Sequence, residues 1–173
     1  MVASWPAPDG SRRDDEAEQA MTALQEFIVQ IRSLRKEYNV PEGERVSVVL
    51  AGAPAAFVAT VEDQREAVER LARVDDIQAG GVEISGVGAH AVLKNGAEVF
   101  VPLEGVIDIA RERERLQTEI ERLAEQFEAA RRKLENENFV SRAPDEVVER
   151  ERAKADSFEE QMEKLKTKLQ GLQ

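Results

Sequence analysis

The sequence predicts an α+β protein, in which a small domain of helices and β-sheet is followed by a long antiparallel two-helix coiled-coil hairpin. Two observations lead to this prediction. Over residues 14–105, helical patterns alternate with β-branched runs and turn signals, which is typical of a small α+β domain. Over residues 106–173, apolar residues recur at alternating steps of three and four on both sides of a short break, and this spacing is the heptad pattern of coiled coils.

The N-terminal end of the chain predicts a flexible lead-in over residues 1–13, followed by a helix. The lead-in contains a tryptophan, two prolines and a glycine, and it shows no hydrophobic period. From residue 14 onward, acidic side chains stand where a helix N-terminus favours negative charge, and apolar residues keep helical spacing. Pro41 and Gly43 are expected to end this helix at about Tyr38.

The stretch that follows predicts a small sheet with one helix. A β-branched run predicts a strand at 45–50, and further apolar runs predict two or three more strands, among the segments 82–84, 89–93 and 98–103. An amphipathic pattern predicts a helix somewhere between residues 55 and 73. The dipeptide Asn95-Gly96 separates the last two strands and is typical of a tight hairpin turn with positive φ, so the sheet is expected to be partly antiparallel.

Two heptad seams of similar length occupy the last third of the chain. The first seam consists of Val106, Ile109, Arg113, Leu116, Ile120, Leu123, Phe127, Ala130 and Leu134. The second consists of Val148, Glu151, Ala155, Phe158, Met162, Leu165, Leu169 and Leu172. If residues 136–144 form the tip of a hairpin, the numbers of facing residues share one sum, 282, so that Phe127 is expected to face Ala155. Each helix of nearly thirty residues would then project roughly 40 Å.

Heptads alone also allow each helix to pair with another copy of the chain. The matched seam lengths and the short break, which contains Pro144, favour the intramolecular hairpin over such a dimer. We therefore expect a monomer whose residues 106–173 form the coiled-coil arm. Residues 14–105 are expected to form the small α+β domain.

The net charge of −11 is spread unevenly along the chain. Residues 1–105 hold 10 basic and 18 acidic side chains, whereas residues 106–173 hold 14 and 17. Residues 129–154, around the predicted tip, carry seven basic side chains against six acidic ones. An acidic chain argues against nucleic-acid binding as a whole, and the tip is its least acidic part. Mixed charge on solvated coiled-coil flanks explains the same pattern without any ligand.

The residue inventory argues against several classes of site. Cysteine is absent and His90 is the only histidine, so neither a disulfide framework nor a metal site is expected. The glycines at 86 and 88 spell G-x-G-x-x-A with Ala91, but the dinucleotide fingerprint must open a helix and here a hairpin follows. No side chain stands out as a general acid or base, so no catalytic site is expected. Without a long apolar run or a leader, we expect a cytoplasmic protein with no membrane contact.

Five stretches of the sequence carry a resemblance to a known family, namely residues 1–6, 24–32, 35–41, 101–108 and 133–140. The most specific is KLENENFV at 133–140, which is followed by Ala143-Pro144, Val147-Val148 and the run 151–154. These stretches resemble the C-terminal end of the valyl-tRNA synthetases, which are class I aminoacyl-tRNA synthetases. The resemblance runs from the end of the family's anticodon-binding domain through the tip of its coiled-coil arm.

The resemblance implies that this chain is a C-terminal piece of an enzyme that activates valine with ATP and transfers it to tRNA. The family's catalytic domain, with its HIGH-type and KMSKS-type signatures, and its editing domain are missing from this sequence. In the family, the arm reaches the outer corner of the L-shaped tRNA, where the D and T loops meet. We therefore expect this chain to bind and position valine-specific tRNA alongside the parent enzyme's catalytic and editing domains, and we expect ATP to be used only by the catalytic domain.

Basic side chains near the tip are the candidates for contacts with RNA phosphates. They are Arg131, Arg132, Arg142, Arg150 and Lys154. Phe139 is interpreted as a plug that closes the tip rather than as a platform for a stacked base. The alternative function is a coiled-coil protein-interaction module without RNA binding, which stays open because the acidic residues before the arm repel RNA at low salt.

Overall fold

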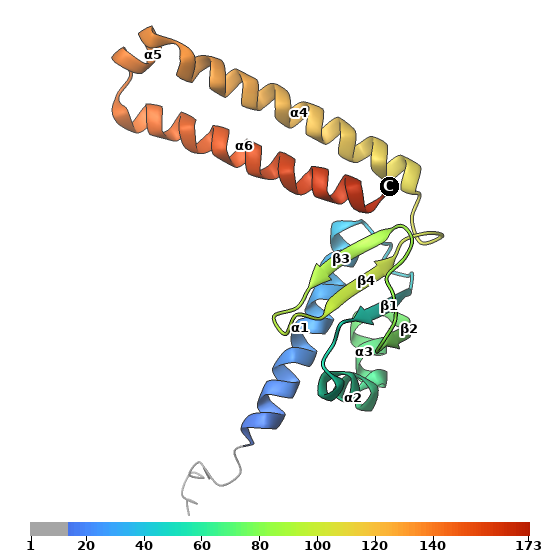
Figure 1. The fold of residues 1–173 in the computed structure, drawn as a ribbon. Helices are drawn as coiled ribbons and strands as arrows, with labels where there is room; N and C mark the ends of the chain where they lie inside the picture. The colour runs from blue at the N-terminus through green and yellow to red at the C-terminus, as the bar shows by residue number, and fades with distance from the viewer. Residues whose placement is uncertain (1–13) are drawn as a thin grey trace, which may run out of the picture.

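The structure is a computed structural model that describes residues 14–173, so the lead-in predicted for 1–13 lies outside the described residues. Figure 1 shows a body of helices and sheet from which two long helices project side by side. The elements of the body are α1 (Asp15–Glu37), β1 (Val46–Ala51), α2 (Ala55–Asp63), α3 (Arg65–Ala72), β2 (Val74–Ala79), β3 (Gly88–Val92) and β4 (Glu98–Pro102). An α+β fold with a projecting hairpin is therefore confirmed.

The body is a four-stranded mixed sheet covered by one layer of helices. The strands lie in the order β2-β1-β4-β3, with β1 and β2 parallel and the other pairs antiparallel. Helix α1 packs on β3 and β4, α3 packs on β2, and α1 also contacts α2 and α3. Val48, Leu50, Val99 and Val101 from the central strands are buried under this layer. The partly antiparallel sheet predicted from the sequence is thus present.

Helix α1 begins and ends close to the predicted positions for identifiable reasons. The Asp14 side chain caps it by accepting a hydrogen bond from the Ala17 backbone N–H at 3.0 Å. Its apolar stripe is buried from Leu24 onward, where Phe27 and Ile31 also enter the body core, whereas Met21 near the start of the helix is exposed. The helix stops at Glu37, just before the turn in which Asn39 adopts a left-handed φ of 54°.

Two predictions for the body were wrong in detail. The helix predicted between 55 and 73 is two short helices separated at Gln64. The strand predicted at 82–84 is irregular backbone, and strand β2 instead occupies Val74–Ala79. Asp75 and Asp76 make this segment a poor strand by propensity, and its parallel pairing with β1 decides its conformation.

The hairpin between β3 and β4 is confirmed, although its turn is not the two-residue type. Only Gly96 of the Asn95-Gly96 pair has positive φ, at 83°. The Gly96 N–H donates to the Leu93 carbonyl at 2.9 Å, and the Leu93 N–H donates to the Ala97 carbonyl at 2.8 Å. This arrangement is a three-residue loop, in which a turn is followed by a left-handed glycine.

The arm consists of α4 (Ile109–Glu135), α5 (Glu137–Arg142) and α6 (Asp145–Gly171). Helices α4 and α6 lie antiparallel along each other, and the short α5 occupies the tip between them (Figure 1). Each long helix has 27 residues, which corresponds to roughly 40 Å at about 1.5 Å per residue. The first helix begins three residues later than the predicted seam, where the Asp108 side chain caps it by accepting from the Arg111 N–H at 3.0 Å.

The seam agrees with the prediction except at its base. Leu116, Leu123 and Ala130 are buried on α4, and Val148, Glu151, Ala155 and Met162 are buried on α6. Lys133 Nζ on α4 lies 3.6 Å from Glu151 Oε2 on α6. The two residue numbers sum to 284, which differs by two from the sum of 282 predicted for facing residues. Arg113, however, is exposed, and Glu112 takes the buried position. Glu112 is held there by ion pairing with Arg115 at 2.7 Å.

The base of the arm is part of the body's hydrophobic core. Leu116 on α4 and Leu172, just after α6, are buried in the same cluster as Phe27 and Leu103 of the body. The other buried residues of the seam lie outside this cluster. The arm therefore stands on the body through shared apolar packing at its base, and only its outer part is a free-standing coiled coil.

Polar contacts reinforce this base. Lys168 Nζ lies 3.0 Å from Glu37 Oε1, and Asn39 Nδ2 donates to Glu112 Oε1 at 3.4 Å. The Lys168 ammonium also lies 5.9 Å from the centre of the Tyr38 ring, within the range of a cation–π contact. These contacts join the C-terminal end of α1 to both long helices of the arm.

Tyr38 makes this junction sensitive to alkaline pH. Burial raises the pKa of Tyr38 to about 12, and the nearby carboxylates of Glu37 and Glu112 add to the shift. In the unfolded chain the phenol ionises near pH 10, so above that pH the unfolded state gains stability that the folded state does not share. We expect the free energy of unfolding to fall by about 2 to 3 kcal/mol as the pH rises from 10 to 12.

Two measurements check this expectation. Tyr38 is the only tyrosine of the chain, so the ultraviolet absorbance of tyrosinate reports its ionisation directly. Urea unfolding of the parent chain and of Tyr38→Phe at several alkaline pH values separates its contribution from those of lysines, because the phenylalanine variant should lose less stability over this range. A folded-state midpoint near pH 10 would contradict the prediction.

Candidate nucleic-acid interface

The candidate phosphate contacts all lie toward the outer end of the arm, away from the body. Arg131 and Arg132 stand in the last turns of α4, Arg142 ends α5, and Arg150 and Lys154 stand in the first turns of α6. All five side chains are exposed. The fold therefore brings together residues from both halves of the arm, although the described geometry differs among the five.

Arg131 and Arg150 are ion-paired within their own helices. Arg131 Nε lies 2.8 Å from Glu135 Oε1, and this hydrogen bond raises the pKa of Arg131 above its ordinary value. Arg150 Nη2 lies 3.1 Å from Glu146 Oε1. Such exposed pairs contribute little to stability because water screens them, so either arginine can exchange its carboxylate for a phosphate at little cost.

Arg132 and Arg142 have no such partners. Their guanidinium groups make no hydrogen bond or ion pair with any residue in the described part of the chain. Arg132 follows Arg131 on α4, and Arg142 is the last residue of α5. Of the five candidates, these two have their charge least compensated.

Lys154 is part of a bridge between the two helices of the arm. Its ammonium lies 2.7 Å from Glu151 Oε1, while Lys133 on the facing helix approaches the other oxygen of the same carboxylate. The hydrogen bond from Lys154, with the charge of Lys133, lowers the pKa of Glu151. This three-residue bridge joins α4 to α6 over a buried carboxylate. Sequence reasoning did not single out Lys133, because only the facing of the two helices shows its partner.

The tip also carries a small apolar hollow. A pocket of about 330 Å³ is lined by Leu134, Glu135, Glu137, Val140 and Ser141. Val140 is 37% exposed, while Phe139 is half-buried, which is compatible with its interpretation as a plug. The Asn136 side chain caps α5 by accepting from the Asn138 N–H at 3.0 Å, and it thereby fixes this turn of backbone between the long helices.

The motifs set aside in the sequence have structural roles. Gly88 opens strand β3 rather than a helix, as the hairpin interpretation predicted. His90 is an exposed strand residue whose ring lies 4.6 Å from that of Phe100. Within residues 14–173, no group of three potential ligand side chains is placed to hold a metal ion, and no helix combines the length and apolarity needed to cross a membrane.

Taken together, the fold and the tip define a class of protein: a coiled-coil arm module, anchored on a small α+β body, with uncompensated cations at its far end. Residues 108–173 match the family model described as the valyl tRNA synthetase tRNA binding arm. The chain is a homologue of the C-terminal part of the valyl-tRNA synthetases, and residues 108–173 correspond to the tRNA-binding arm of that part.

Relatives from several bacteria support this assignment over nearly the whole chain. The valine-tRNA ligase of Mesorhizobium japonicum is 36% identical over 96% of this chain, and that of Nitratidesulfovibrio vulgaris is 36% identical over 98%. The enzyme of Bacillus subtilis is 34% identical over 95% of the chain. The chain spans 18% to 20% of the length of these curated relatives.

Proposed function

We propose that this chain binds tRNA through the outer end of its arm, at the corner where the D and T loops meet, and positions it for aminoacylation with valine. Catalysis with ATP, and editing, are assigned in this proposal to the remaining part of a parent synthetase acting in the cytoplasm. The observation that carries the proposal is the pair of uncompensated cations, Arg132 and Arg142, at the end of an arm of the matching family.

Stiffness supports a positioning role. The base of the arm shares the core of the body through Leu116 and Leu172, and the Lys133–Glu151–Lys154 bridge ties the two helices near the tip. An arm held at both places keeps its contact groups in position before the ligand arrives. Such preorganisation lowers the conformational cost of association.

Distance supports the role as well. The body is acidic, since residues 1–105 carry 18 acidic side chains against 10 basic ones, and this charge repels RNA. At physiological ionic strength, charges are screened over about 8 Å, whereas each arm helix of 27 residues extends roughly 40 Å. The tip is therefore several screening lengths from most of the repelling charge.

The apolar hollow offers a second kind of contact. Val140 and Leu134 line it, and Arg142 follows two residues after Val140 on the same short helix. Exposed bases in folded RNA present apolar faces next to phosphates, so an apolar surface beside cations suits recognition by shape rather than by sequence.

The test is a tRNA-binding titration of Arg132→Gln/Arg142→Gln at two salt concentrations. If each arginine contacts one phosphate, we expect affinity to fall about tenfold at low salt and the slope of log affinity against log salt to flatten by about one unit per contact. Single variants at Arg131 and Arg150 should have smaller effects, because their charges are already partly compensated.

The matched control is Arg111→Gln/Arg113→Gln at the base of α4. These two side chains are exposed, make no side-chain hydrogen bond or ion pair within the described chain and give the same change in net charge. The control should bind tRNA within about twofold of the parent chain. Equal affinity and equal salt slope for the tip variant and the control would refute the proposal.

A protein-interaction module remains the second candidate. The observation that favours it is the exposure of Val140 and Val147, each 37% exposed, which a partner helix could cover. This function predicts concentration-dependent association without affinity for tRNA. Sedimentation analysis of the parent chain, with and without tRNA, distinguishes the two candidates.

A further inference from the structure

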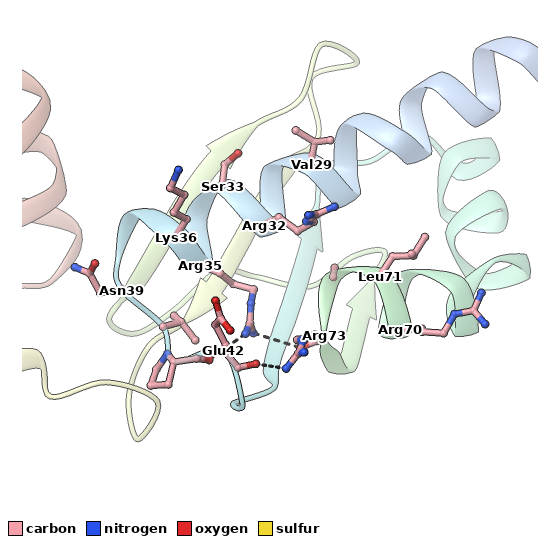
Figure 2. Close-up of a pocket in the computed structure, with 13 residues that line it drawn as sticks. Val29, Arg32, Ser33, Arg35, Lys36, Asn39, Glu42, Arg70, Leu71 and Arg73 are labelled. Carbon is pink, nitrogen blue, oxygen red and sulfur yellow. Dashed lines mark hydrogen bonds between the residues drawn. The ribbon is translucent and has the colours of Figure 1, made fainter.

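A second group of cations lines a groove on the body, far along the chain from the arm. The groove has a volume of about 1070 Å³ and lies where α1 passes α3 (Figure 2). Its basic lining residues are Arg32, Arg35, Lys36, Arg70 and Arg73, and Glu42 is the one acidic residue that lines it. This local excess of positive charge stands out on a body whose overall charge is strongly negative.

Most of these cations lack an anionic partner. The side chains of Arg32, Lys36 and Arg70 are exposed and make no hydrogen bond or ion pair with any residue between 14 and 173. On the arm, by contrast, Arg131 and Arg150 each hold a carboxylate of their own helix. The groove therefore offers more uncompensated positive charge than those arginines do.

Arg35 adds a buried positive charge to the floor of the groove. It is only 7% exposed, and its guanidinium donates to the carbonyl oxygens of Glu44 at 2.8 Å and of Pro41 and Arg73 at 3.3 Å each. Carbonyl groups satisfy its donors but leave its charge unneutralised. Burial lowers the pKa of Arg35, and the positive charge of Arg73 lowers it further, as two cations at close quarters require.

Arg73 stands at a backbone position that favours glycine. Its φ is 56°, in the left-handed region, where it terminates α3. Its side chain reaches back to donate to the Glu42 carbonyl, as the dashed line in Figure 2 shows. Glycine would adopt this conformation with less strain, so the arginine places a further cation beside Arg35 at a conformational cost.

We propose that this groove binds the phosphate backbone of RNA, as a second contact of the tRNA that the tip of the arm engages. The inference rests on the proposed function for the identity of the RNA. An open groove with several unpaired cations suits a ligand with repeated negative charges, and Arg32 and Lys36 stand one helical turn apart on α1, which matches successive contacts along a backbone. Screening over about 8 Å limits the opposing influence of more distant acidic side chains.

The groove variant Arg32→Gln/Lys36→Gln/Arg70→Gln tests the inference in the full chain. We expect its affinity for unfractionated tRNA to fall at least about tenfold at low salt, and the salt slope to flatten by about two to three units, since each lost duplex phosphate contact removes about 0.9. The control is Lys94→Gln/Arg111→Gln/Arg113→Gln. This control changes the net charge equally through exposed side chains without side-chain partners, and it should stay within about twofold of the parent chain.

Arg73→Gly provides a variant with a small expected effect on folding. Glycine relieves the left-handed strain while the exposed hydrogen bond to the Glu42 carbonyl is lost, so the melting temperature should stay close to that of the parent chain. Its affinity for tRNA should nevertheless fall about threefold, through the loss of one cation from the groove. An affinity that stays at the parent value in this correctly folded variant would count against the inference.

The tip variant Arg132→Gln/Arg142→Gln, measured in the same assay, separates the two proposals. A loss of affinity in the tip variant, with the groove variant binding like its control, overturns the groove inference and leaves the proposed function standing. If neither variant differs from its control, both fail. A groove variant that binds tRNA like its control, but no longer associates with the rest of a parent synthetase, assigns the groove to a protein partner and also overturns the inference.

Discussion

Replacing Gly88 by alanine is expected to lower the free energy of unfolding by about 3 kcal/mol or more, at or above the upper end of the usual range for overpacking. A β-carbon at this position would lie 2.3 Å from the ring of Phe100 and 2.5 Å from the Val101 carbonyl oxygen. Phe100 is 1% exposed and Val101 is in a paired strand, so neither atom can move aside without disturbing the sheet. Chemical denaturation of Gly88→Ala measures the loss.

The same change should also disturb the base of the arm. The Gly88 carbonyl oxygen lies against α6, where a β-carbon on Gly171 would be only 3.1 Å from it. We therefore expect faster hydrogen exchange in β3 and at the C-terminal end of α6. Gly43→Ala is the matched control, because a β-carbon there meets nothing within 4 Å and the backbone does not require glycine. Equal stability of Gly88→Ala and Gly43→Ala would contradict the prediction that a β-carbon at position 88 collides with Phe100 and Val101.

Replacing Leu116 by alanine is expected to cost about 3 to 5 kcal/mol of unfolding free energy, as for other fully buried leucines. Leu116 has no exposed surface and belongs to the hydrophobic cluster that joins the arm to the body, together with Leu172. The resulting cavity would lie between the arm and the sheet. Hydrogen exchange should consequently rise in strands β3 and β4 as well as in the arm helices.

Leu123→Ala is the control for this prediction. Leu123 is 3% exposed on the same helix, two turns further out, and it lies outside the cluster that the arm shares with the body. Its replacement should loosen α4 and α6 by a comparable amount while the strands keep their protection from exchange. Undisturbed strands in Leu116→Ala would mean that the arm and the body do not share a core.

The local pattern of the sequence was sufficient for the arm. Heptad spacing is a property of residues within a few turns of each other, so both helices could be predicted from it. The matched seam lengths and the short break that contains Pro144 predicted their antiparallel pairing and the position of the tip. The exception is instructive: Arg113 keeps the heptad step, yet Glu112 is buried in its place. At this point α4 meets the body, and Asn39 donates a hydrogen bond to Glu112.

The sheet shows where local pattern is insufficient. Strand β2 contains Asp75 and Asp76 and has little strand propensity, and it forms because β1 offers a parallel partner after the α2–α3 crossover. The run 82–84 looks like a strand, but it lies between Gly81 and Gly86, both of which have positive φ. Pairing across the chain decided the first outcome, and the left-handed glycines on either side of the run decided the second.

The candidate site, too, was only partly predictable from the sequence. Counting charges along the sequence found the basic tip, yet it could not separate Arg132 and Arg142 from Lys154, whose partner Glu151 also bridges to the facing helix. Averaging over the first 105 residues concealed the groove altogether, because Arg32 and Lys36 lie far in the chain from Arg70 and Arg73. The only local sign of the groove in the sequence was the pair of cations Arg32 and Lys36, which stand one helical turn apart on a predicted amphipathic helix.

The sequence by itself determined the hairpin arm, the one-sided helices of the body and the likeness to the C-terminal part of the valyl-tRNA synthetases, because each depends on short-range periodicity or on contiguous motifs. Only the tertiary structure decided that the arm and the body share a core through Leu116 and Leu172, that Val74–Ala79 is a strand, and that five cations meet in one groove. These features depend on contacts between residues far apart in the chain, and such contacts leave no regular spacing in the sequence.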